Sequence, residues 1–145
     1  TLIILFVIMT SGCGNKTENV QFDLPENASV SDLPYYPCRL KDNTGNNSFA
    51  VLIYKSEMVQ YADVFKQFGY YGNGISWEEL CRTIIKLENK KLLDQITFET
   101  NEVQSTMIFN SKDLQQQVAN IIHGWTTDKE KLRTAFSEVN SIYME

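Results

Sequence analysis

The sequence has little of what enzymes and metal proteins usually need. It contains one histidine, His123, and three cysteines in 145 residues, and they are not spaced as a metal-binding cluster. No H-E-x-x-H, G-x-S-x-G, phosphate-loop or dinucleotide-binding motif occurs. His123 lies just before Gly124 near the expected end of a helix, where a histidine tolerates the negative end of the helix dipole. We therefore expect no catalytic centre, no metal and no cofactor.

Basic residues are also few. The chain has 13 Lys and Arg against 18 Asp and Glu, which gives a formal net charge of -5. The largest basic cluster is the pair Lys90-Lys91, whereas nucleic-acid phosphates require stripes of Lys and Arg. This composition excludes a nucleic-acid partner and favours a basic one, mainly through faster association.

Long apolar runs are missing as well. The run from Leu2 to Met9 is far shorter than the roughly 20 apolar residues of a membrane span. It is followed by Thr-Ser-Gly and then by Cys13, which resembles the end of a bacterial lipoprotein signal peptide. The chain opens on Thr1 without a methionine or basic residues, so we expect residues 1–12 to be a signal peptide whose beginning is absent.

Cys13 is then the expected lipidated residue. Residues 14–31 are polar and rich in asparagine, so residues 13–34 are predicted to be a lipidated tether. Because two or more acyl chains hold a protein durably on a bilayer, we expect membrane anchoring outside the cytoplasm. The alternative is a buried strand or core helix that happens to end near a cysteine.

Residues 35–145 predict one α+β domain. The apolar spacing predicts strands at 35–41 and 48–55, helices at 57–68 and from Ser76, strands near 96–99 and 106–109, and helices after Ser111 and Thr127. Ser76 with Glu79 and Thr127 with Glu130 have the spacing of capping boxes, Ser111 is the expected cap of the third helix, and Gly69 is placed to end the first. Trp77 lies on the apolar stripe of the second helix and is expected in the core. The order ββ-α-α-ββ-α-α indicates a mostly antiparallel sheet from two hairpins, interleaved with two helix pairs.

The two other cysteines, Cys38 and Cys81, are both expected to point into the core. Cys38 lies in the first strand pattern and Cys81 on the apolar face of the second helix. They are either two buried thiols that act as small apolar side chains or, in an oxidising compartment, a disulfide.

The most distinctive motif joins the first two helices. The residues Phe65-x-x-Phe-Gly-Tyr-x-Gly-Asn-Gly-x-x-Trp77, together with the later Ser111-x-Asp113-x-x-x-x-Val118 pattern, resemble the immunity protein 51 family of bacterial polymorphic-toxin systems. The resemblance runs from about residue 35 to residue 136. It implies a non-enzymatic protein that binds and neutralises a cognate toxin. The sequence departs from the family at the second hairpin, where Glu-Thr-Asn-Glu102 replaces an expected Asp-Pro-Glu-like turn.

Five residues are candidates for toxin binding: Tyr70, Tyr71, Asn73, Glu99 and Glu102. At most one of the two tyrosines turns inward easily, and an exposed tyrosine with nearby carboxylates suits a basic protein partner. Asn73 has a second interpretation, as a side chain that bonds the backbone.

Two alternatives remain open. The second candidate surface is the helix face around residues 115–117. The alternative function is a surface lipoprotein that binds a small ligand or an envelope component, which a hollow lined by Tyr70, Tyr71 and Trp77 would favour.

Overall fold

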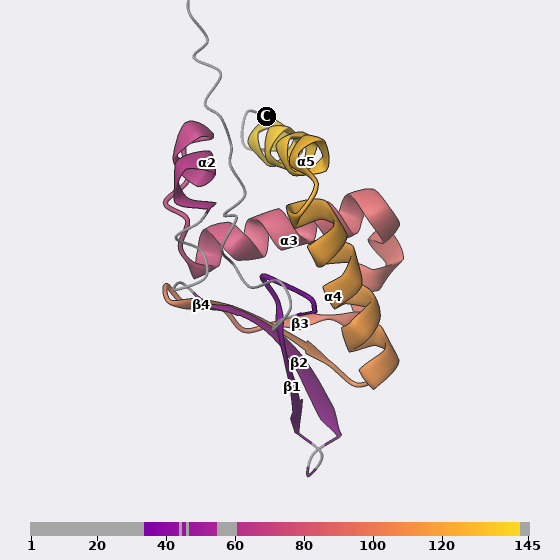
Figure 1. Cartoon of the computed structure of the whole chain (residues 1–145). Coiled ribbons are helices and arrows are strands. Elements are labelled where there is room, and N and C mark those ends of the chain that lie inside the picture. Colours follow the sequence, from indigo (N-terminus) through magenta and orange to yellow (C-terminus); the bar gives the residue numbers. More distant parts are fainter. Residues whose placement is uncertain (1–33, 44, 46, 55–60, 143–145) are drawn as a thin grey trace, which may run out of the picture.

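The protein folds as a four-stranded antiparallel sheet with helices on one of its faces (Figure 1). The computed structural model describes residues 34–142 apart from 44, 46 and 55–60. The described elements are β1 (Arg39–Asn43), β2 (Ser48–Tyr54), α2 (Ala62–Gln67), α3 (Gly74–Asn89), the 3-10 helix η2 (Lys90–Gln95), β3 (Thr97–Phe98), β4 (Gln104–Phe109), α4 (Lys112–Thr126) and α5 (Lys129–Ile142). The predicted α+β class is confirmed.

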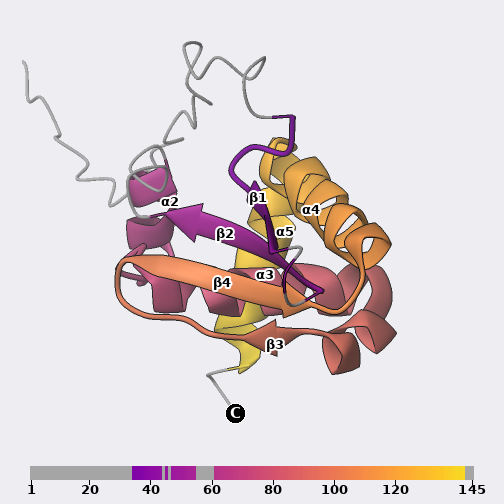
Figure 2. The same ribbon diagram turned by 90° about the horizontal axis from the view of Figure 1, so that it is seen from below.

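Both predicted hairpins are present, and they form one sheet of order β1-β2-β4-β3. The hairpins join where β2 pairs with β4 in antiparallel register, with Val51 opposite Met107. The helices lie on one side of the sheet, so its other face looks outward in the view from below (Figure 2).

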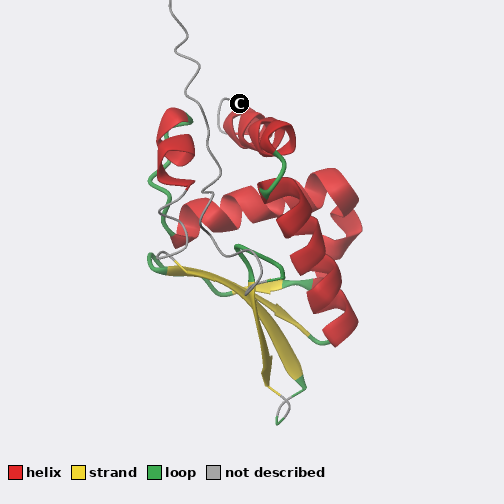
Figure 3. Cartoon of the chain, in the orientation of Figure 1, coloured by secondary structure: helices red, strands yellow, loops and turns green. Residues whose placement is uncertain are grey.

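The core lies between the sheet and the helices. Alternate residues of the two central strands, Val51 and Ile53 on β2 and Met107 and Phe109 on β4, are buried, as a sheet covered on one face requires. Helices α3 and α4 pack against the sheet. Helix α5 packs on α3 and α4 and lies farther from the sheet, as does α2 (Figures 1 and 3).

Several predicted elements begin or end at other residues in the structure. Residues 34–37 form a turn instead of a strand, and the Cys38 amide donates to the Tyr35 carbonyl over 2.8 Å. Strand β1 therefore begins only at Arg39. The 3-10 helix η2 was not predicted, because its short span gives no clear periodic pattern. The predicted helix at 57–68 is described only from residue 61 onward, and its beginning lies outside the described residues.

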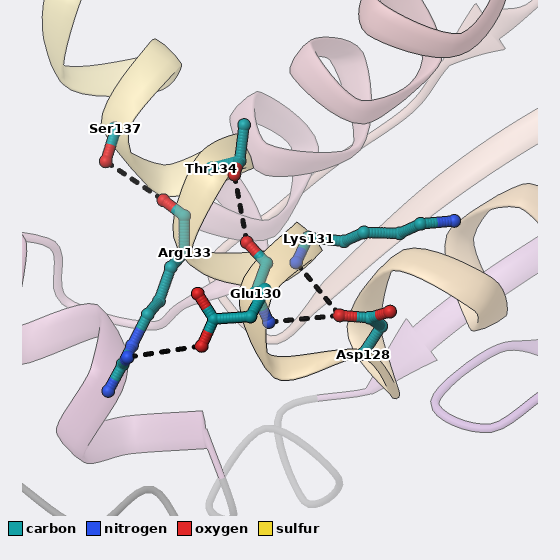
Figure 4. Close-up of polar contacts among 6 residues, drawn as sticks. All are labelled: Asp128, Glu130, Lys131, Arg133, Thr134 and Ser137. Carbon is teal, nitrogen blue, oxygen red and sulfur yellow. Dashed lines mark hydrogen bonds and ion pairs between the residues drawn. The ribbon is translucent and has the colours of Figure 1, made fainter.

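The cap of α4 is as predicted, but that of α5 is not. The Ser111 hydroxyl accepts from the Leu114 amide, which caps α4. At α5 the Asp128 carboxylate, not the predicted Thr127, accepts from the amides of Glu130 and Lys131 at 3.0 Å each (Figure 4). The Thr127 hydroxyl instead donates to the His123 carbonyl.

Gln115 is buried, Gln116 is half-buried and Gln117 is exposed, so the helix face around residues 115–117 is only partly the exposed surface that the sequence indicated. The Gln115 side-chain amide nitrogen donates to the carbonyls of Ala50 at 2.8 Å and Lys41 at 3.2 Å. Gln115 therefore ties α4 to the first hairpin, and it is fully covered.

Candidate functional site

The loop between α2 and α3 is built on two glycines with positive φ. Gly69 has φ 84° and Gly72 has φ 66°, a region that residues with a Cβ rarely adopt. At Gly69 the chain makes both bonds of a Schellman motif, from Tyr70 N to Phe65 O (2.8 Å) and from Gly69 N to Lys66 O (3.1 Å). The predicted role of Gly69 in ending this helix is confirmed.

Asn73 caps α3, which corrects the predicted capping box of Ser76 and Glu79. The Asn73 side-chain oxygen accepts from both the amide and the hydroxyl of Ser76, at 3.0 Å each. Because Gly74 already lies in the helix, Ser76 is too far along to be its cap. The side-chain to backbone bond expected of Asn73 is confirmed, so Asn73 has a folding role whether or not it contacts a partner.

Gly74 brings the loop against the tip of the second hairpin. Its amide donates to the Glu102 carbonyl over 3.1 Å. The space that a Cβ would occupy at Gly74 is filled by the carbonyl oxygens of Asn101 and Gln104. Two segments that are distant in sequence, the loop 69–75 and the turn 99–104, therefore meet at one edge of the molecule.

Asn101 shapes this turn, and the sequence reasoning did not single it out. Its side-chain oxygen accepts from the amides of Val103 at 2.9 Å and Gln104 at 3.0 Å. The Asn101 amide in turn donates to the Gln104 carbonyl over 3.0 Å. An asparagine at the start of a polar connection is the signal that could have identified it.

Large apolar side chains are exposed where the loop and the turn meet. Tyr71 is 95% exposed, Val103 57% and Ile75 50%. We call Tyr71, Ile75, Glu99, Glu102 and Val103 the loop–turn surface. Another exposed apolar side chain, that of Tyr54, lies opposite Gln104 in the sheet and so is near the same edge. Exposed apolar groups gathered in this way mark protein-binding surfaces more often than scattered ones do.

The two tyrosines have different environments, as the sequence led us to expect. Tyr71 is almost fully exposed, whereas Tyr70 is half-buried. Burial and, to a smaller extent, the Glu79 carboxylate raise the pKa of the Tyr70 phenol above its ordinary value. Tyr70 therefore keeps its proton and carries no charge at neutral pH.

The loop–turn surface is acidic. Glu99 and Glu102 are both exposed. Neither of them forms one of the ion pairs found among the described residues. No Lys or Arg occurs from residue 69 to 79 or from 99 to 104. The structure places Tyr70, Tyr71 and Asn73 in one loop, and it brings that loop against the turn that carries Glu99 and Glu102.

Trp77 belongs to the core and not to this surface. It is fully buried, with its ring edge-to-face on Tyr61 at a centroid distance of 5.1 Å. Its position on the apolar stripe of α3 was the sequence prediction, and it is confirmed.

The two described cysteines and the histidine lie outside the loop–turn surface. No disulfide joins Cys38 and Cys81, and both thiols are buried. Burial raises the pKa of the Cys81 thiol well above its ordinary value, so it stays protonated. His123 is half-buried, with Nδ1 2.7 Å from the Tyr36 carbonyl oxygen. Within the described part of the chain, no three His, Cys, Asp or Glu side chains are grouped as a metal site.

Cys13, the predicted signal peptide and most of the predicted tether lie outside the described residues. Among the helices that are described, none has the length and apolar character needed to cross a membrane.

The described fold is that of a small α+β protein whose most exposed apolar groups lie on one acidic edge, as in a protein that binds other proteins. The chain belongs to the immunity protein 51 family, whose model matches residues 38–141. That match spans the sheet, all the described helices and both parts of the loop–turn surface. No curated protein and no solved structure matches the chain. Membership of this family implies a toxin as the partner.

Proposed function

We propose that this protein binds its cognate toxin through the loop–turn surface and neutralises it by binding alone, without catalysis. The observation that carries the proposal is the bond from the Gly74 amide to the Glu102 carbonyl. It joins the loop that carries exposed Tyr71 to the turn that carries Glu99 and Glu102.

The two kinds of residue have different roles in this proposal. Tyr71 offers a large, rigid side chain that loses little conformational entropy on binding, which is typical of residues that dominate an interface. Glu99 and Glu102 lie at an exposed tip, where charge acts mainly on the rate of encounter. Tyr71 is therefore expected to control dissociation and the two glutamates association.

Binding kinetics with the purified toxin domain test these roles. Tyr71→Ala should raise the dissociation rate constant by roughly 10-fold or more, because loss of an interface anchor commonly costs 2 kcal/mol or more. The double variant Glu99→Lys with Glu102→Lys should lower the association rate constant, most strongly at low salt, since salt screens exposed charges.

Matched controls separate these effects from changes in total charge or apolarity. Leu87→Ala removes another exposed apolar side chain, which lies about 20 Å along α3 from Gly74 at the usual rise per residue. Asp94→Lys with Asp113→Lys makes the same change in net charge at two other exposed sites. The surface has been assigned wrongly if the loop–turn variants have the rate constants of the wild type, or the same rate constants as these controls.

We also propose that the domain is anchored outside the cytoplasm by lipid on Cys13. The support comes from the sequence: a short apolar run, small residues, the cysteine and then a polar segment. An anchored inhibitor would meet an incoming toxin before the toxin enters the cell.

A small-ligand function has one observation in its favour. A hollow of about 550 Å³ is lined by Tyr70 and Tyr71, although buried Trp77 is not part of it. Native mass spectrometry of protein purified from its own membrane fraction would reveal a retained ligand. A ligand whose retention is lost in Tyr71→Ala, in a strain that still resists the toxin, would support this second function.

A further inference from the structure

Strand β3 leaves one side of the sheet open. The order β1-β2-β4-β3 makes β1 and β3 the two edge strands, and in the view from below β3 is the last strand on its side (Figure 2). An edge strand presents backbone N–H and C=O groups that no neighbouring strand binds, so another chain can pair with it. The two edges of this sheet differ in how far they are covered.

The β1 edge is covered by a helix and carries basic residues. Helix α4 contacts β1, and the Gln115 side chain of α4 donates to the Lys41 carbonyl. The Lys112 ammonium of the same helix lies 2.8 Å from the Asp42 carboxylate of β1. Lysines on an edge also oppose the addition of a strand. Among the described strands, β3 is paired through β4 alone.

The hydrogen bonds beside β3 show which backbone groups face outward. The amides of Glu99 and Asn101 each donate to a carbonyl of β4 at 3.0 Å. In an antiparallel pair, alternate residues direct their backbone groups toward the partner strand and away from it. The N–H and C=O groups of Phe98 and Thr100 are therefore directed toward the open edge.

The charge beside this edge is negative. Asp94 and Glu99 are both exposed, and neither forms one of the ion pairs found among the described residues. No Lys or Arg occurs from residue 92 to residue 111. The Arg82 guanidinium stacks on the Phe98 ring, 3.7 Å from its centroid, but it is already paired with the Glu78 carboxylate at 2.8 Å.

An extended, basic segment of a protein suits this edge. When a strand is added to a sheet, backbone hydrogen bonds supply affinity and side chains supply specificity. The exposed carboxylates favour a segment that carries Lys or Arg. Glu99 belongs both to this edge and to the loop–turn surface, so the two are continuous.

We propose that an extended segment of the toxin adds to the sheet beside β3, with its backbone bonded to Phe98 and Thr100 and a Lys or Arg side chain paired with Glu99. The inference rests on the proposed toxin-binding function and specifies how the toxin is held. It extends the contact from the loop–turn surface along the edge of the sheet.

Two substitutions at one position separate the backbone from the side chain. Thr100→Pro removes an outward N–H at a place on an edge strand where proline is tolerated. It should weaken toxin affinity roughly 5- to 150-fold, the effect expected when a buried acceptor loses its donor. Thr100→Ala keeps the N–H and should bind within about threefold of the wild type. Circular dichroism and urea unfolding establish whether both variants are folded.

Amide exchange in the wild-type protein tests the pairing without any substitution, because NMR resolves the exchange rate of each amide. Binding of the purified toxin domain should slow exchange at Phe98 and Thr100 by roughly tenfold or more, since a hydrogen-bonded amide exchanges only when the structure opens. The amides of Glu99 and Asn101 are the internal reference. They are already bonded to β4 in the free protein and should change less.

The outcomes separate this inference from the proposed function. Strand addition is wrong if exchange at Phe98 and Thr100 is unchanged by the toxin, or if a folded Thr100→Pro binds like Thr100→Ala. In either case, weakened binding by Tyr71→Ala would leave the toxin-binding function standing. If Thr100→Pro does not fold, the exchange rates of the wild type decide alone.

Two further results would overturn the inference. The first is a wild-type dimer, seen by analytical ultracentrifugation, that Thr100→Pro converts to a monomer with no change in toxin affinity. The edge would then pair with a second copy of this chain. The second is a wild-type protein that neither binds the toxin nor protects cells, in which case the proposed function fails as well.

Discussion

Tyr71 and Trp77 are close in sequence but have opposite environments. The helical spacing of Trp77 with Leu80 and Ile84 predicted its burial, because α3 must present one apolar face to the core. No pattern of this kind covers the loop, where two consecutive tyrosines and three glycines allow several conformations. Which tyrosine is exposed depends on the backbone at Gly69 and Gly72, whose φ angles are both positive.

Gly74 shows how one missing Cβ allows the site to form. Gly74→Ala should destabilise the protein by roughly 1 to 3 kcal/mol, the range for overpacking, because the added carbon overlaps the carbonyl oxygens of Asn101 and Gln104. Urea unfolding measures the change. Gly124→Ala is the control: it lies in α4 with nothing within 4 Å of the added carbon and should stabilise by roughly 0.5 to 1 kcal/mol. Equal stability of the two variants would show that Gly74 is not the contact point.

At the scale of elements, the two corrected helix caps have the same cause. Near each helix start the sequence offers two suitable capping residues, Asn73 or Ser76 for α3 and Thr127 or Asp128 for α5. A capping box identifies spacing only. The backbone decides which side chain reaches the free amides, and at α3 it begins the helix at Gly74 so that this glycine fits against the hairpin.

The α5 cap gives a direct comparison between two neighbouring side chains. Asp128→Ala should lower the free energy of unfolding by roughly 0.5 to 2 kcal/mol, the usual effect of losing an N-cap, because both amide bonds in Figure 4 are lost. Thr127→Ala should cost less than about 0.5 kcal/mol, since the His123 carbonyl keeps its bonds from the Thr126 hydroxyl and the Thr127 amide. A larger loss in Thr127→Ala than in Asp128→Ala would restore the cap inferred from sequence.

The order of strands also belongs to the scale of elements. Each hairpin was predictable, because its strands are close in sequence and separated by turn-forming residues. The pairing of β2 with β4 was not, because no local pattern specifies which hairpin edges meet. This pairing sets the start of β4, and with it the turn 99–104, near the start of α3.

For the whole molecule, the proposed anchor can be tested without the toxin. Expressed from its natural reading frame, the wild-type protein should fractionate with membranes and incorporate radioactive fatty acid. Cys13→Ser should appear in the soluble fraction and lose the label, because no thiol remains to carry the lipid. Cys38→Ser is the control, since Cys38 is a buried thiol of the domain. Unchanged fractionation and labelling of Cys13→Ser would refute lipid anchoring.

The net negative charge is likewise a property of the whole chain, but the fold decides where the charged side chains lie on the surface. The sequence fixes the excess of Asp and Glu, and with it the preference for a basic partner. Their distribution depends on folding, because the turn that carries Glu99 and Glu102 meets the loop that carries Tyr71 only through the contact at Gly74.

By itself, the sequence determined the α+β class, both hairpins, the described α-helices and the immunity protein 51 family. These depend on residue spacing and local motifs, which are read along the chain. The tertiary structure alone decided that Gly74 contacts the second hairpin and that Tyr71 is exposed. Such contacts join segments distant in sequence, and they follow from the packing of α3 against β4, which local patterns do not encode.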